Sequence, residues 1–249
     1  MIRRPPRSTL DRSSAASDVY KRQVKGISFN IEEDEILGLL GPNGSGKTTT
    51  IGMLLGLLKP TSGEIFINGQ KLEGNRIEIL EQINFISPYI ELPKKLTVKQ
   101  NLTVYGKLYK INNINERIEF LSEKLRLGGL LNGITGELSS GQKNRVSLAK
   151  ALINEPKVLL LDEPTASLDP EVGDFVRSFL EDYKKEKKIS ILLASHNMNE
   201  VTRLCKSILM MKDGIIIDEG NPKELINKHG RKNLEEVFLK LSRSKNELN

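Results

Sequence analysis

The sequence lacks the features of disulfide-rich, cysteine-ligated metal and membrane-spanning proteins. Cys205 is its one cysteine, so there is no disulfide framework and no cysteine pair at metal-ligand spacing. A single thiol suits a reducing compartment, and we expect Cys205 to be a small packing residue. The longest apolar runs, such as VLLL and ILLA, have the length of buried strands and fall far short of the roughly 18 residues that span a bilayer.

The body of the chain also lacks a net positive charge. The formal net charge is +6, but residues 1–23 contribute +4 and residues 221–249 contribute +3, which leaves residues 24–220 at −1. A near-neutral body with basic ends is weak evidence for nucleic-acid binding, so no nucleic-acid partner is expected.

Alternating buried strands and helical patterns predict an α/β core with a mostly parallel sheet, because that order of elements favours parallel pairing. A block of helical pattern between the two halves predicts an inserted helical lobe, and the final pair of strands predicts a hairpin. The expected strands are 27–31 (exposed), 36–40, one within 62–69, 157–162, 189–196 and the hairpin 207–220. The expected helices are one that the segment GPNGSGKT opens and that ends near Lys59-Pro60, then 101–111, 115–127, 140–154, 171–187 and 197–204, followed by a short helical appendage over 221–249.

GPNGSGKT at 41–48 has the G-x-x-x-x-G-K-[ST] spacing of a phosphate-binding loop, between an expected strand and an expected helix. Its glycines let successive backbone N–H groups face one anion, and the helix N-terminus adds a positive dipole end. Lys47 would reach the outer phosphates and Thr48 would ligate Mg²⁺. The candidate nucleotide contacts are Gly41, Pro42, Asn43, Gly44, Ser45, Gly46, Lys47, Thr48 and Thr49.

KVLLLDEP places two carboxylates at the end of an expected buried strand, where ligands gather in open α/β sheets. Asp162 is placed to hold Mg²⁺ together with Thr48. Glu163 is placed to polarise a water molecule for attack on the γ-phosphate. The predicted cofactors are therefore ATP and Mg²⁺.

ELSSGQ opens a second expected helix and offers a second anion-binding helix N-terminus, formed by Ser139, Ser140, Gly141 and Gln142. Alone, such a segment is more often a plain helix cap. Because the chain already has one phosphate loop, a second phosphate-binding site indicates that two chains share each nucleotide across a dimer.

The ordered set GPNGSGKTT, LSSGQ, VLLLDEPTASLDP and ASH resembles the ATP-binding subunit of an ABC transporter over roughly residues 24–241. The resemblance implies a P-loop NTPase core with a mostly parallel sheet, an antiparallel β edge and an inserted α-helical subdomain at about 88–152, followed by a polar tail at 242–249. It also implies that two subunits pack head to tail, with Ser139 and Gly141 against the partner's nucleotide. Asp169 would communicate across that dimer, and His196 would contact the γ-phosphate and hold the attacking water.

Three positions depart from the family pattern. Asp34 stands before Glu35 where the family often has glycine, which is a turn detail. Ser140 stands where the family has a second glycine, which is a small change at a helix start. The slot of a glutamine that reaches the metal and the attacking water falls on Pro88, although a registration shift would place Ser87 or Tyr89 there. We therefore assign no glutamine role and expect a slower or differently coupled ATPase.

The resemblance implies an ATP-hydrolysing subunit, peripheral on the cytoplasmic face of the cell membrane, that energises export by a separate permease. The tail NLEEVFLKL at 233–241 is similar to those of subunits serving exporters. A homodimer is favoured because both half-sites look intact. The alternatives are an ABC-type ATPase acting on ribosomes or DNA, which the single motif set and the lack of sustained heptads disfavour, and a nucleotide-binding module without turnover.

Residues 1–23 match neither the first strand nor the adenine-stacking aromatic of the family, and Tyr20 is the candidate for the latter. Their Arg and Ser content suits an organellar transit peptide, but Asp11, Asp18 and two prolines interrupt an amphipathic helix. They also resemble translated adapter sequence joined where the native N-terminus was lost. We expect a non-native or disordered leader.

Overall fold

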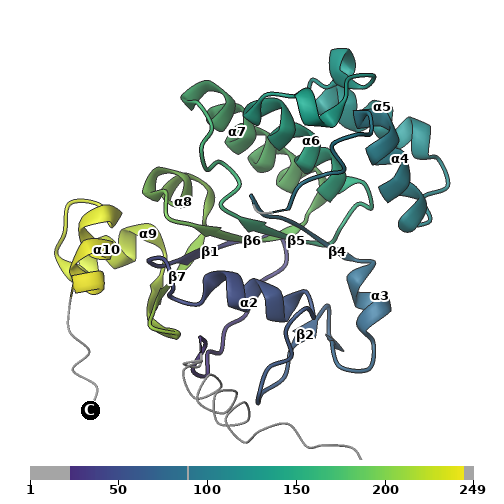
Figure 1. The fold of residues 1–249 in the computed structure, drawn as a ribbon. Helices are drawn as coiled ribbons and strands as arrows, with labels where there is room; N and C mark the ends of the chain where they lie inside the picture. The colour runs from purple at the N-terminus through teal and green to yellow at the C-terminus, as the bar shows by residue number, and fades with distance from the viewer. Residues whose placement is uncertain (1–22, 89, 244–249) are drawn as a thin grey trace, which may run out of the picture.

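The computed structural model describes residues 23–88 and 90–243. Its centre is a six-stranded sheet in the order β4-β5-β6-β1-β7-β8, parallel except for the antiparallel edge pair β7–β8 (Figure 1). A separate two-stranded antiparallel sheet pairs β2 with β3. The strands are β1 (Ile36–Leu40), β2 (Phe66–Ile67), β3 (Gln70–Lys71), β4 (Ile83–Ile86), β5 (Val158–Asp162), β6 (Ser190–Ser195), β7 (Ser207–Lys212) and β8 (Ile215–Gly220).

The central strands are apolar on both faces, so the sheet separates two hydrophobic cores, as expected for parallel strands covered on both sides. Along β1, Leu37 and Leu39 pack into one core, while Ile36 and Leu40 pack into the other. The first core is closed by α2 (Lys47–Leu54), α3 (Arg76–Leu80) and the small sheet. The second is closed by α4 (Val98–Leu108), α5 (Ile114–Lys124), α6 (Ser140–Leu152), α7 (Pro170–Lys187), α8 (Met198–Leu204), α9 (Pro222–His229) and α10 (Leu234–Arg243).

Helices α4, α5 and α6 lie between β4 and β5 in the chain and form the helical layer at the upper right of Figure 1. Helix α4 begins before its predicted start because Thr97 and Gln100 form a reciprocal capping box. Two 3₁₀ turns, Gly128–Leu130 and Thr135–Glu137, connect α5 to α6. Among the described residues no helix is both long and apolar enough to cross a membrane.

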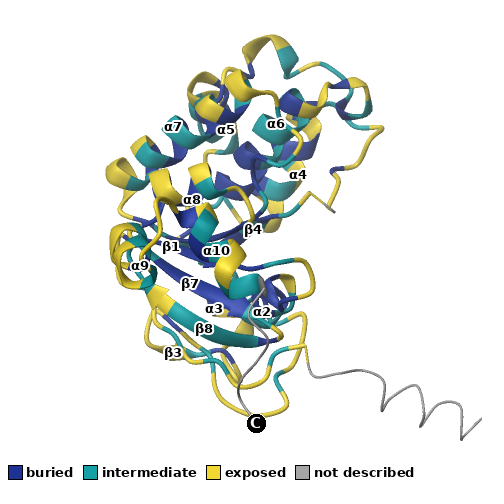
Figure 2. Ribbon diagram, turned by 90° about the vertical axis from the view of Figure 1, so that its left-hand side faces the viewer, coloured by how far each residue is buried: buried dark blue, intermediate teal, exposed yellow. Residues whose placement is uncertain are grey.

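The prediction of an exposed strand at 27–31 is wrong, because this segment pairs with no other strand among the described residues. Burial in the sheet falls from β7 to the edge strand β8 (Figure 2). The segment 27–31 alternates as predicted, with Ile27, Phe29 and Ile31 half-buried and packed against the first core. Within the described residues it joins no β-ladder, and a strand requires a hydrogen-bonded neighbour. The predicted leader and Tyr20 lie outside the described residues, apart from Gln23.

Cys205 is buried and His229 is half-buried. Cys205 is 6% exposed and packs in the second core, as expected, and burial raises the pKa of its thiol. His229, which the polar tail suggested would be solvated, lies instead against the buried Asp218 carboxylate, with Nε2 to Oδ2 at 2.6 Å. This pair joins α9 to β8.

Lys150 on α6 is a buried cation beside the end of β4. Its Nζ donates to the Phe85 carbonyl at 3.2 Å and lies over the rings of Phe85 and Tyr105. Burial lowers the pKa of Lys150 to about 8. The charged form is therefore less favourable in the folded chain than in the unfolded chain.

This lowered pKa predicts a stability that rises with pH. Between the folded pKa of about 8 and the ordinary value of 10.5, the unfolded chain binds more protons, so raising the pH stabilises the fold. Chemical denaturation of wild type and Lys150→Met between pH 7.5 and 10 should show wild type gaining about 2 kcal/mol relative to the variant. A difference that is constant with pH would contradict the assignment.

Candidate nucleotide site

The loop between β1 and α2 needs its glycines for steric reasons. Gly44 and Gly46 have φ of 80° and 108°, a region that side chains disfavour. A Cβ on Gly46 would meet the Gln23 carbonyl at 2.7 Å, and one on Gly41 would meet the Met211 carbonyl at 2.5 Å. The tight loop therefore brings its backbone close to neighbouring segments, as the predicted phosphate loop requires.

The end of this loop has unsatisfied hydrogen-bonding capacity. Helix α2 begins after Gly46 with no side chain capping its N-terminus. The Ser45 hydroxyl is buried and has no hydrogen-bond partner among the described residues. An anion placed there would satisfy the free N–H groups and meet the helix dipole, so the loop fits a phosphate group.

Lys47 folds back over this loop. Its Nζ donates to the carbonyls of Gly41 at 2.7 Å and Pro42 at 3.2 Å. Burial lowers the pKa of Lys47, and the negative charges of Glu163 and Asp162 oppose that shift. The sequence prediction grouped these three side chains, and the structure brings them together.

Thr48 and Asp162 form a hydroxyl–carboxylate pair at the adjacent end of β5. Thr48 Oγ1 donates to Asp162 Oδ2 at 3.1 Å across 114 residues of sequence. Burial raises the pKa of Asp162, while the Thr48 bond and the Lys47 charge lower it. Oxygen atoms of this kind are the ligands that Mg²⁺ prefers, so the pair fits the predicted metal site.

Glu163 and His196 meet beside this pair. Glu163 adopts a left-handed φ of 52°, which turns the chain away from β5, and its N–H donates to the Ala194 carbonyl on β6 at 2.8 Å. Its Oε1 lies 2.7 Å from His196 Nδ1. The two candidate catalytic side chains therefore come from neighbouring strand ends and contact each other.

The segment Ser139–Gln142 caps α6 with a capping box, since Ser139 Oγ accepts from the Gln142 N–H at 3.3 Å. Asp169 caps α7 by accepting from the Val172 N–H at 3.0 Å. The two helix starts touch, because a Cβ on Gly141 would lie 3.2 Å from Val172. Ser139, Ser140 and Asp169 are exposed, on the side of the sheet opposite to α2.

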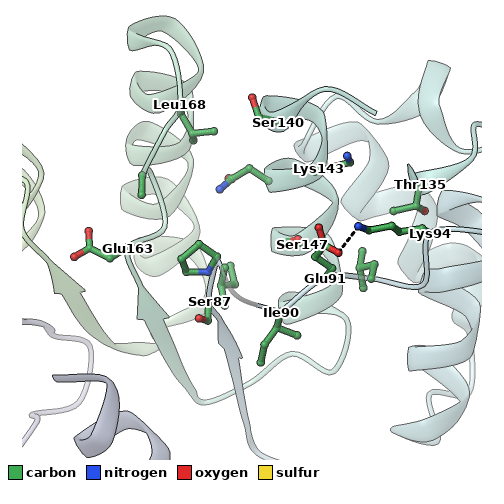
Figure 3. A pocket seen from close by; sticks show the side chains of 15 residues that line it. Ser87, Ile90, Glu91, Lys94, Thr135, Ser140, Lys143, Ser147, Glu163 and Leu168 are labelled. Atoms are coloured by element: carbon green, nitrogen blue, oxygen red, sulfur yellow. Dashed lines mark ion pairs between the residues drawn. The ribbon is translucent and has the colours of Figure 1, made fainter. Parts of the chain in front are cut away.

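Pro88 lies two residues beyond β4 and is exposed. It lines a cavity of about 220 Å³ that also contacts Glu163, Ser140 and Leu168 (Figure 3). An ion pair between Glu91 and Lys94, 2.6 Å, lies at the rim. The loop with the predicted glutamine slot thus borders the cavity that Glu163 lines.

The sequence analysis missed a buried network behind Glu163 and His196. Glu200 is fully buried, and its two carboxylate oxygens accept from the hydroxyls of Thr165 and Ser195. Thr165 and Ser195 lie in motifs that had been singled out. Glu200 gave no signal, because a glutamate in the first turn of a helix is ordinarily an exposed partner of the helix dipole.

The chain resembles proteins of known family along most of its length. A family model described as "ABC transporter" matches residues 24–166. The ABC transporter ATP-binding protein NatA of Bacillus subtilis is 35% identical over 88% of this chain and 89% of its own. The bacitracin transport ATP-binding protein BcrA of Bacillus licheniformis is 36% identical over 92% and 74%. A Nod factor export ATP-binding protein I of Rhizobium is 36% identical over 88% and 72%.

Solved structures agree in fold. One described as the ATP-binding subunit of an ABC transporter has a TM-score of 0.81 and 26% identity, covering 90% of this chain and 94% of that one. The dimeric ATP-binding cassette MJ0796 bound to ADP and Pi has a TM-score of 0.74 and 27% identity, covering 80% and 90%.

The phosphate loop between a parallel strand and its helix, with acidic residues at the end of a second strand, defines a P-loop ATPase. The chain belongs to the ABC transporter family. Within it, this chain is an ATP-binding subunit that hydrolyses ATP. The predicted α/β fold with an antiparallel edge pair is confirmed.

Proposed function

We propose that this chain binds to the cytoplasmic face of a separate membrane permease and energises export through it. The observation that carries the proposal is the chain of contacts from Thr48 to Asp162 and from Glu163 to His196 beside a loop shaped for phosphate. Export is supported by relatives named for Nod factor export and bacitracin transport. In this proposal residues 24–241 are the ATPase domain, with a helical subdomain at about 88–152.

The residue roles follow from their positions. The backbone of residues 41–49 and the Lys47 amine would hold the phosphates of ATP, and Thr48 and Asp162 would hold Mg²⁺. When bound, Mg²⁺ would offset charge on the phosphate oxygens. Glu163 would accept the proton of the attacking water, and His196 would keep that water and the γ-phosphate in line.

The proposed partner at the nucleotide is a second copy of the chain. Ser139, Ser140, Gly141 and Gln142 lie on the other side of the sheet from α2, so they would complete the phosphate site of another subunit. Asp169 lies beside them at the start of α7 and would join the same interface. The dimeric cassette similar to this chain supports such pairing.

Purification from detergent-solubilised membranes tests the transport role. Co-purification of the full chain with an integral membrane protein is the expected result. Co-purification with ribosomes or DNA in place of a membrane protein would overturn the proposal.

Because Pro88 occupies the expected glutamine slot, we expect slow ATP hydrolysis. Proline offers no side-chain donor or acceptor to the water or the metal. Pro88→Gln should therefore raise the steady-state ATPase rate of the full chain several-fold, which is the change in rate expected when one hydrogen bond is gained in the transition state. Pro93→Gln, in the same segment outside the expected slot, is the matched control. An unchanged rate in Pro88→Gln would show that the residue at position 88 does not limit ATP hydrolysis.

A further inference from the structure

A single buried carboxylate joins the two segments that carry Glu163 and His196. Glu200 lies in the first turn of α8 and is fully buried. Its Oε1 accepts from Thr165 Oγ1 at 2.8 Å, and its Oε2 accepts from Ser195 Oγ at 2.7 Å. Thr165 is two residues after Glu163, and Ser195 is immediately before His196.

The network fixes the backbone around His196. Ser195 Oγ also accepts from the Asn197 N–H at 3.0 Å, so the residues on both sides of His196 are tied to the Glu200 carboxylate. The Asn197 side chain then caps α8. Because the His196 side chain is 64% exposed, packing constrains it little, and its orientation depends on this backbone and on its contact with Glu163.

Both oxygens of Glu200 are engaged by donors, which holds the side chain in one orientation. Burial raises the pKa of Glu200, whereas the two hydroxyl bonds and the positive charge of Arg177 lower it. A fully satisfied buried network of this kind rigidifies the segments that it connects.

We propose that Glu200 is a positioning residue for ATP hydrolysis, setting the distance between Glu163 and His196 by bridging Thr165 and Ser195. The proposal rests on the proposed roles of Glu163 and His196. Glu200 is fully buried, so it would act on the reaction only through Thr165 and Ser195. Small misplacements of catalytic groups cost large factors in rate, so a bridge that fixes two strand ends acts on kcat.

Glu200→Gln is the test. Glutamine keeps the volume but loses the negative charge and one acceptor oxygen, so the hydroxyl that faces its NH₂ group must turn to accept where it now donates. Steady-state ATPase of the full chain should show kcat lowered about tenfold or more with KM for ATP changed less than about twofold, because the phosphate loop is untouched. Thr165→Val, which keeps shape and leaves Glu200 charged, should lower kcat in the same direction.

Glu35→Gln is the matched control. Glu35 is also a buried carboxylate, 5% exposed, that accepts from the Ser207 hydroxyl and from the Glu32 N–H. It precedes β1, at the end of the sheet opposite to the phosphate loop. Its substitution should lower the melting temperature while leaving kcat within about twofold of wild type, as expected for a bridge remote from the chemistry.

Wild-type kcat in both Glu200→Gln and Thr165→Val would overturn the positioning role, as would equal losses of kcat in Glu200→Gln and Glu35→Gln. These outcomes are separable from failure of the proposed function. Full activity in Glu163→Gln would refute the catalytic assignment on which the inference rests. An inactive Glu163→Gln beside wild-type kcat in both Glu200→Gln and Thr165→Val would refute the inference alone.

Discussion

Glu163→Gln is expected to lower the ATPase kcat by about 10²–10⁴-fold, the contribution of a positioned general base. Glutamine keeps the size of the side chain and an oxygen near His196, but it cannot accept a proton from water. ATP binding should be retained, because Glu163 lies beyond the loop that would hold the phosphates. Single-turnover hydrolysis and equilibrium nucleotide binding measure the two effects separately.

Glu119→Gln is the control for this change. Glu119 is exposed on α5 within the helical layer, so the same loss of charge should leave kcat unaltered. A Glu163→Gln enzyme that keeps more than about a tenth of the wild-type rate would contradict a general-base role.

Asp162→Asn is expected to weaken binding of MgATP by about 10–100-fold, the typical cost of losing a group that holds a metal or orients its ligands. Asparagine keeps an oxygen that accepts from Thr48, so the local hydrogen bond survives while the negative charge is lost. Calorimetric titrations with MgATP, and with ATP in the presence of a chelator, give the metal-dependent part.

The comparison of the two titrations is the internal control for Asp162→Asn. Binding of metal-free ATP should be weakened much less than binding of MgATP. Equal weakening in both titrations would show that Asp162 acts on the shape of the phosphate loop and that the metal is held elsewhere.

Periodicity predicted the buried strands and most helices, because strands covered on both faces read as continuous apolar runs. It failed where pairing or a cap decides the outcome. Residues 27–31 alternate like a strand but pair with no described neighbour. None of the expected strands covers β4, whose four residues include the polar Asn84, and the Asn84 amide donates to Asn154 Oδ1 at 2.9 Å. The spacing of apolar residues does not reveal such a side-chain partner.

The candidate site was predictable where residues are adjacent in a motif, and less so where the fold brings distant ones together. The phosphate loop and the pair Asp162–Glu163 follow from local spacing. The direct contact between Glu163 and His196 requires β5 and β6 to be neighbours, which the sequence suggests through the strand order alone. Glu200 was missed because its burial depends on α8 packing against the sheet.

In the proposed dimer, ATP joins two copies of this chain, with the phosphate loop of one against Ser139–Gln142 of the other. Light scattering of Glu163→Gln, which should bind ATP without consuming it, measures this most directly. We expect the monomer mass of 27.9 kDa without nucleotide and twice that mass with saturating MgATP. Adding Ser139→Arg, which places a bulky cation at the interface, should restore the monomer while ATP still binds. A Glu163→Gln chain that binds ATP and remains monomeric would contradict the claim.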